Sequence, residues 1–193
     1  MMVLDLSPSL FIGKGRHRKC YQHPNDSSLC VKVVYNPTRG GKKELKRELN
    51  YYRHLQKRRI DWRILPSFHG QVDTTQGTGY IFDLIRDYDG SPSKSLNDYL
   101  PKDFHDSVND ATLHALLSEL KQDLIKNRII TMTLKAQNIL YKKESSTTGR
   151  LVVVDNIGNA AFFPLANYVD TLSITKIERT WARFIDSLNL TSR

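Results

Sequence analysis

One charged residue inside an apolar strand constrains this chain more than any other feature of its sequence. The segment SLCVKVVY, residues 28–35, is apolar and rich in valine apart from Ser28 and Lys32, and this composition predicts a strand that is at least half buried. An unpaired charge that leaves water is costly in free energy. The rest of the chain must therefore bring a partner to Lys32.

The next segment offers a carboxylate that needs a cation. Residues 42–59, KKELKRELNYYRHLQKRR, have the apolar periodicity of a helix. At roughly 100° per residue, Glu48 falls within the apolar arc of this helix. No basic residue stands three or four places from Glu48 to hold it locally. Glu48 therefore needs a partner from elsewhere in the chain.

The order of the remaining elements indicates the fold class. Residues 10–24 predict two strands around a glycine turn, and 138–143 with 150–156 predict a hairpin. A strand that leads into an acidic connector is expected at 78–90. Three helices are expected after it: a short one at 95–100, a core helix at 108–127 and an amphipathic one at 172–190. Strands and helices do not alternate along this chain, so we predict an α+β fold and exclude a parallel doubly wound sheet.

The length and composition set limits on the architecture and the location. A chain of 193 residues accommodates one domain or two small lobes. Its apolar runs fall far short of the ~18 residues that indicate a membrane span. The N-terminus lacks the pattern of a secretory signal, so a cytoplasmic location is expected. Cys20 and Cys30 are too few for a metal quartet and are expected to be ordinary strand residues.

The positive charge of the chain is concentrated in its first third. The net charge is +9, which divides into +10 for residues 1–64 and −1 for residues 65–193. Such a basic segment attracts nucleic acid, an acidic membrane surface or the phosphates of a nucleotide. The sequence has no zinc-ligand cluster, helix-turn-helix signature or basic strand with interleaved aromatic residues. Nucleic acid is therefore a less favoured partner.

Six residues spread along the chain resemble the nucleotide site of the protein-kinase-like fold in order and approximate spacing. They are Gly13, Gly15, Lys32, Glu48, Asn138 and Asp155. The resemblance implies a two-lobe fold over residues 1–193 as a single domain, with a mainly β N-lobe over about 1–85 and a minimal, truncated helical C-lobe over 86–193. Because 38 residues follow Asp155, the resemblance leaves no room for a full peptide-binding platform and favours a non-protein acceptor.

The resemblance also implies a role for each residue of the N-terminal set. Gly13 and Gly15, in GKGRHRKC, would lie over the phosphates of ATP, where residues without a Cβ let the backbone approach. Arg18 stands where the third glycine of such a loop is usual, and it adds positive charge there. Lys32 would contact the phosphates, and Glu48 would pair with it.

The C-terminal set implies metal binding and an altered catalytic loop. In TMTLKAQNILY, Leu134, Lys135 and Asn138 match the kinase catalytic loop, and Lys135 would neutralise the transferred phosphate. Asn138 and Asp155 would bind Mg²⁺. Thr133 stands where the catalytic aspartate is usual, and threonine cannot act as a carboxylate base. Catalysis with an altered base and a catalytically silent pseudokinase therefore both remain open.

Each of these features has a simpler interpretation when it is taken alone. Two glycines form an ordinary hairpin turn, Lys32 protects an edge strand, and Asn138 and Asp155 terminate a turn and a strand. The acidic connector, with Asp83, Asp87 and Asp89, either reaches a ribose or is a solvated loop. The joint occurrence of the set in the kinase order favours the nucleotide site.

A narrower resemblance covers most of the chain, from about Gly13 to Phe184. The runs GRHRKCYQHP, RELNYYRHL, GTGY, TMTLKAQNIL and DNIG are similar to the small bacterial YrbL family of PhoP regulatory network proteins. This resemblance implies a kinase-like fold in a magnesium-responsive regulatory network. We expect a protein that binds ATP and Mg²⁺ and transfers phosphate to a non-protein or unusual acceptor, or else a silent module that binds a regulatory protein.

Overall fold

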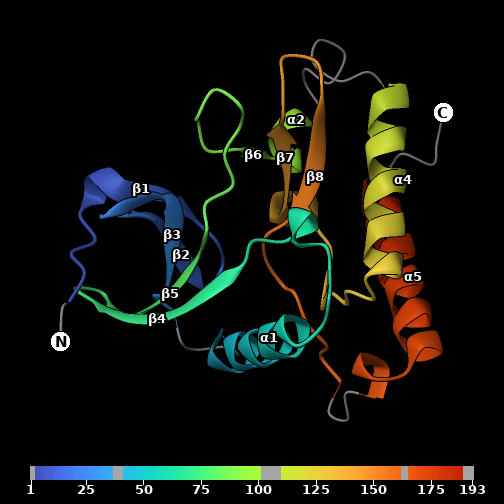
Figure 1. Ribbon diagram of the computed structural model, residues 1–193, viewed down its shortest axis with the longest axis horizontal. Helices are drawn as coiled ribbons and strands as arrows, with labels where there is room; N and C mark the ends of the chain where they lie inside the picture. The colour runs from blue at the N-terminus through green and yellow to red at the C-terminus, as the bar shows by residue number, and fades with distance from the viewer. Residues whose placement is uncertain (1–2, 37–40, 101–109, 162–164, 189–193) are drawn as a thin grey trace.

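The computed structural model describes residues 3–36, 41–100, 110–161 and 165–188. Within these ranges the chain forms two antiparallel sheets and four α-helices. The α+β class expected from the sequence is confirmed. The larger sheet and the first helix come from the N-terminal half, and the smaller sheet and the other helices follow them (Figure 1).

The larger sheet has five strands in the order β1-β2-β3-β5-β4, and each neighbouring pair is antiparallel. The strands are β1 Phe11–Lys14, β2 Arg18–His23, β3 Asp26–Val34, β4 Phe68–Thr74 and β5 Gly77–Asp83. The sequence analysis did not identify β4. Side chains alternate between the faces of a strand, so Val31 and Val33 in β3 lie on the face opposite to Lys32.

Both faces of this sheet are covered. Val31 and Val33 pack on one face with three residues from the N-terminal segment and β2, namely Leu4, Leu6 and Tyr21. Helix α1, Gly41–Gln56, packs on the other face through Tyr52, whose ring lies 5.4 Å from that of Phe82. The charge of Lys32 therefore lies on the same side of the sheet as α1.

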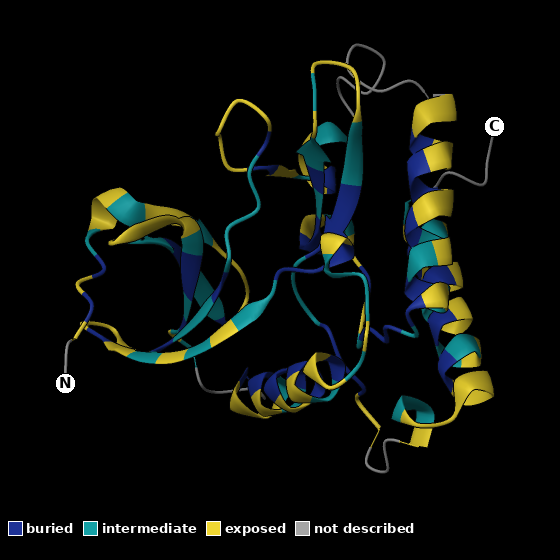
Figure 2. Cartoon of the chain, viewed as in Figure 1, coloured by how far each residue is buried: buried dark blue, intermediate teal, exposed yellow. Residues whose placement is uncertain are grey.

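The second half consists of a short sheet with helices on its outer side. The sheet has the order β6-β7-β8, formed by Lys94–Ser95, Ile139–Lys143 and Gly149–Val153. Helices α4, Asp110–Lys126, and α5, Asp170–Ser187, lie side by side (Figure 1). Figure 2 shows that α4 is buried on the side that faces the hairpin and exposed on its outer side. Helix α2 and four 3₁₀ segments complete the fold: α2 Leu96–Tyr99, η1 Pro8–Leu10, η2 Trp62–Ile64, η3 Ala136–Asn138 and η4 Leu165–Asn167.

The helices and the hairpin predicted from periodicity are confirmed, with small changes at their ends. Helix α1 ends at Gln56 instead of residue 59. The expected start of α4, at residue 108, and the expected end of α5, at residue 190, lie outside the described residues. In the described ranges no helix combines the length and the apolar composition that a membrane crossing requires.

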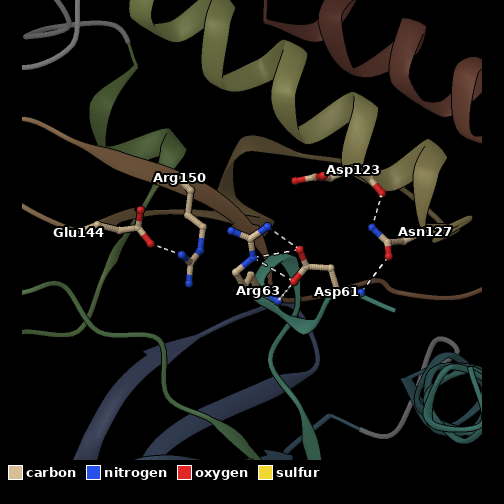
Figure 3. A network of polar contacts seen from close by, with 6 residues as sticks. All are labelled: Asp61, Arg63, Asp123, Asn127, Glu144 and Arg150. Carbon is tan, nitrogen blue, oxygen red and sulfur yellow. Dashed lines mark hydrogen bonds and ion pairs between the residues drawn. The ribbon is translucent and has the colours of Figure 1, made fainter. Parts of the chain in front are cut away.

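A polar network connects the segment after α1 with the end of α4 (Figure 3). The side chain of Asn127, after the end of α4, accepts a hydrogen bond from the N–H of Asp61 at 2.8 Å and donates one to the carbonyl of Asp123 at 2.9 Å. The Asp61 carboxylate accepts in turn from Arg63, and these hydrogen bonds lower its pKa. The segment that leads into β4 is therefore held against α4.

Candidate functional site

A cavity of about 490 Å³ lies between the larger sheet and the mouth of the β7–β8 hairpin. Five of the seven site residues predicted from the sequence line it: Gly13, Gly15, Lys32, Asn138 and Asp155. The connector after β5 closes one side with residues 83–85. Residues more than 100 positions apart in the sequence therefore meet at one cavity.

The hairpin register brings Asn138 and Asp155 together. Ile139 pairs with Val153, and the N–H of Val154 donates a hydrogen bond to the carbonyl of Asn138 at 2.9 Å. The side chain of Asn138 is buried, and no hydrogen bond joins its amide to another described residue. Two oxygen-bearing side chains thus stand side by side where the hairpin opens.

The ammonium group of Lys32 reaches the same place from the sheet. Its Nζ donates a hydrogen bond to the carbonyl of Val154 at 2.6 Å and lies 4.7 Å from the centre of the Phe82 ring. Because Val154 precedes Asp155 directly, this hydrogen bond holds the positive charge beside the hairpin mouth.

The ion pair expected between Lys32 and Glu48 is a wrong prediction. Glu48 is 1% exposed, and its Oε2 accepts a hydrogen bond from Nη1 of Arg18 at 2.6 Å. The Nη2 atom of Arg18 forms an ion pair with Asp155. A guanidinium presents several donors in a planar fork and can hold two carboxylates at once, which a single ammonium does less well. Arg18 therefore replaces Lys32 as the partner of Glu48.

The position of Arg18 follows from the pairing of β2 with β3. Cys20 lies opposite Lys32 in this pair, so both side chains point to the same face. Arg18 precedes Cys20 by two residues and shares that face. Strand alternation was the signal in the sequence that could have identified Arg18 as a residue of the site.

A second cavity, of about 330 Å³, adjoins the first. The predicted residues Glu48 and Lys135 line this cavity. Thr133, which also lines this cavity, accepts a hydrogen bond from the side chain of Asn156 at 3.0 Å. Six residues line both cavities: Gly15, Arg16, Arg18, Gln137, Asn138 and Asp155.

The acidic side chains of the connector are held by their neighbours. Asp83 accepts from the N–H of Ser67 at 2.7 Å, and Asp87 accepts from the N–H of Lys143 at 3.0 Å. Asp89 accepts from the N–H of Ser91 at 2.8 Å. The backbone N–H of Ile85, at the cavity wall, has no hydrogen-bond partner among the described residues. This N–H is therefore available to a ligand in the cavity.

Both cysteines line the first cavity as free thiols. A hydrogen bond with Cys20, together with burial, raises the pKa of Cys30. The same hydrogen bond lowers the pKa of Cys20. The raised pKa of Cys30 favours its neutral thiol, which adds weakly polar surface to this wall of the cavity.

Comparison with known sequences identifies the family to which this chain belongs. The family described as PhoP regulatory network protein YrbL matches residues 4–189. The chain belongs to the YrbL family. The YrbL protein of Escherichia coli (strain K12), named as an uncharacterized protein, is 45% identical over 183 residues, which cover 95% of this chain and 87% of that protein. A protein of the same name from Shigella flexneri has the same identity and coverage.

Membership of the YrbL family confirms the narrower of the two resemblances seen in the sequence. The match extends from the first strands to the final helix, so the residues at both cavities lie within it. The family name places these proteins in a PhoP regulatory network.

Proposed function

We propose that this YrbL-family chain is a kinase-like protein that binds ATP with Mg²⁺ in the first cavity and transfers the terminal phosphate to a non-protein or unusual acceptor. The observation that carries the proposal is the convergence of Lys32, Asn138 and Asp155 on one cavity beneath the Gly13–Gly15 turn. The volume of about 490 Å³ is within the range of small-molecule sites. The element order, with one helix between β3 and β4 of an antiparallel sheet and a later hairpin, supports a kinase-like fold.

The glycine turn and Lys32 would bind the phosphates. A Cβ placed on Gly13 would meet no atom within 4 Å, so the backbone there borders open space. The N–H of Gly15 is used within the turn, where it donates to the carbonyl of Arg18 at 2.8 Å. Lys32 supplies a positive charge at the hairpin mouth, where phosphate oxygens need neutralisation.

The connector after β5 would bind the base of the nucleotide. The free N–H of Ile85 can donate one hydrogen bond to a ring nitrogen. Leu84 and Leu140, which also line the cavity, offer apolar surface to a planar ring. Such a combination of apolar walls and a few polar groups is typical of cofactor sites.

The side chains at the hairpin mouth fit a magnesium ion. The side-chain oxygen of Asn138 has no hydrogen-bond partner among the described residues. Asp155 has one carboxylate oxygen outside its contacts with Arg18 and the N–H of Asn156. Among the described residues no three His, Cys, Asp or Glu side chains cluster to form a full metal cage. Mg²⁺ commonly takes one or two protein oxygens together with phosphates and waters. When bound, the ion would neutralise charge on the phosphates.

A catalytically silent pseudokinase is the second candidate, and two observations favour it. Arg18 forms ion pairs with both Glu48 and Asp155. Thr133 has no carboxylate that could accept a proton. In that case the chain would act as a regulatory module on a protein partner. The two candidates share the nucleotide site and differ in turnover.

Thermal unfolding with and without ATP and Mg²⁺ tests the nucleotide site. A ligand at 100 times its Kd stabilises the folded state by about 2.7 kcal/mol, so we expect a clear rise in the Tm of the wild type. The rise should be much smaller in Lys32→Ala and Asp155→Ala. It should persist in Lys57→Ala, which removes an exposed lysine that lines neither cavity. No rise at millimolar ATP would refute nucleotide binding.

Measured ADP formation then separates the enzyme from the silent module. Turnover that is lost in Asp155→Ala and retained in Thr133→Ala supports transfer with an altered base. Binding without turnover supports the pseudokinase.

A further inference from the structure

The second cavity contains buried polar atoms that the protein does not satisfy. His17 is 9% exposed, and neither of its ring nitrogens has a hydrogen-bond partner in the described part of the chain. The carboxylate of Glu44 lies close by, with Oε2 at 3.9 Å from Nε2. Glu48 uses Oε2 for Arg18, while its Oε1 is buried without a partner. Buried polar groups are normally hydrogen-bonded, so these atoms indicate that a bound molecule completes the cavity.

The charges around this cavity favour an anion. Arg16, Arg47 and Lys135 line it, and no ion pair joins any of them to another described residue. Arg18 has one positive charge against the two negative charges of Glu48 and Asp155, which leaves one negative charge there. Glu44 is the one further carboxylate among the lining residues, so the three cations without an ion pair exceed the remaining negative charge by one. Guanidinium and ammonium groups in such a number suit a phosphate group.

We propose that the second cavity binds a small phosphorylated molecule that carries free hydroxyl groups. Arg16, Arg47 and Lys135 contact its phosphate. A hydroxyl donates to Oε1 of Glu48, and His17 exchanges hydrogen bonds with the same ligand, because a neutral imidazole has one donor and one acceptor nitrogen. The volume of about 330 Å³ suits a ligand of this size.

The position of this ligand gives it a role as the phosphate acceptor, and that role rests on the proposed function. Asn138 and Asp155 line both cavities, so the two ligands would lie next to each other. A hydroxyl oxygen of the acceptor would form the new bond to the γ-phosphorus. The bond from that phosphorus to the β,γ-bridging oxygen would break, with its electron pair left on ADP, and the hydroxyl proton would pass to water.

Titration of the full chain with glycerol 3-phosphate, followed by NMR signals of the His17 ring, tests the proposal. A non-hydrolysable ATP analogue and Mg²⁺ are kept in excess, so that the probe does not enter the first cavity. We expect the His17 signals to shift with the probe, and the Kd to rise about tenfold or more in Arg47→Gln and in Lys135→Gln. Arg53→Gln removes an exposed charge from the same helix as Arg47, outside this cavity, and should leave the Kd unchanged.

Three results would overturn the proposal. These are unchanged His17 signals, equal weakening in Arg53→Gln and Arg47→Gln, and binding of glycerol as tight as that of glycerol 3-phosphate. Lys135 is exposed, so its variant remains informative if Arg47→Gln does not fold. If the ATP analogue does not bind while the probe still requires Arg47, the phosphate site stands and the proposed function fails. If the analogue binds and the probe does not, the proposed nucleotide site stands and the proposed phosphate site in the second cavity fails.

Discussion

At the scale of single residues, Arg18 connects three elements near the site. Its side chain is 13% exposed and joins Glu48 of α1 to Asp155 after β8. The guanidinium therefore links the sheet, the helix and the hairpin. A buried carboxylate that loses such a partner keeps its desolvation cost without compensation.

We predict that Arg18→Ala lowers the free energy of unfolding by about 3–5 kcal/mol, the usual cost when one partner of a buried ion pair is removed. Urea unfolding measures this value. The control Arg59→Ala removes an exposed arginine and should change it by less than about 0.5 kcal/mol. The double variant Arg18→Met with Glu48→Leu should recover most of the loss. Equal effects of Arg18→Ala and Arg59→Ala would contradict the role assigned to the ion pair.

At the scale of elements, Tyr51 holds helix α1 against the segment 128–130, which follows α4. Its hydroxyl accepts a hydrogen bond from the N–H of Ile130 at 2.9 Å and donates one to the carbonyl of Arg128 at 3.1 Å. Burial raises the pKa of Tyr51 to about 12. The protonated phenol is thus the form that the folded protein requires.

The raised pKa of Tyr51 predicts a loss of stability at alkaline pH. The ordinary pKa of tyrosine is about 10, so the contribution of this group is fully present below pH 10 and is lost as the pH rises towards 12. By pH 10.5 the loss should be on the order of 1 kcal/mol. Tyr51→Phe should reduce this pH dependence but not abolish it, because burial also raises the pKa of Tyr52. The same variant should lower the free energy of unfolding at pH 7 by about 1–3 kcal/mol, because the N–H of Ile130 is left unpaired.

Urea unfolding at pH 7, 9 and 10.5 checks the prediction for Tyr51. Tyr168 is 72% exposed, so Tyr168→Phe serves as the control and should retain the wild-type pH dependence. If Tyr51→Phe loses stability above pH 9 as steeply as the wild type, the alkaline loss does not come from Tyr51.

At the scale of the whole molecule, one apolar core extends through both halves. The same cluster contains Leu55 and Phe82 from the first half and Leu120, Ile139 and Phe184 from the second. The polar network of Asn127 and Asp61 adds a second connection (Figure 3). Two halves that share one core lose their packing together when either half unfolds.

We therefore predict one cooperative unfolding transition. Trp62 stacks on Tyr52 near the larger sheet, and Trp181 packs against Phe184 in α5, so fluorescence of the variants Trp181→Phe and Trp62→Phe reports on each half separately. The fluorescence midpoint of each variant should coincide with its own midpoint by circular dichroism. Separate fluorescence and dichroism transitions in either variant would mean that the halves unfold independently.

Sequence patterns predicted most of the elements but not all of their partners. Apolar periodicity located α1, α4 and α5, because each helix must bury one face. Strand β4 was missed, since polar His69 and Gln71 alternate with flanking residues that are only partly buried. Glu48 was expected to pair with Lys32, but in the structure it pairs with Arg18. The sequence shows which buried charges need a partner, but it does not show which of two cations lies nearer.

The sequence by itself determined the α+β class, the family, and the residues that carry unusual charge for their surroundings. Periodicity and the cost of burying charge are local properties, so they can be read from neighbouring residues. The tertiary structure alone decided that Arg18 bridges Glu48 and Asp155, and that two adjoining cavities share Asn138 and Asp155. These features depend on strand register and on the approach of segments more than 100 residues apart, which no local pattern encodes.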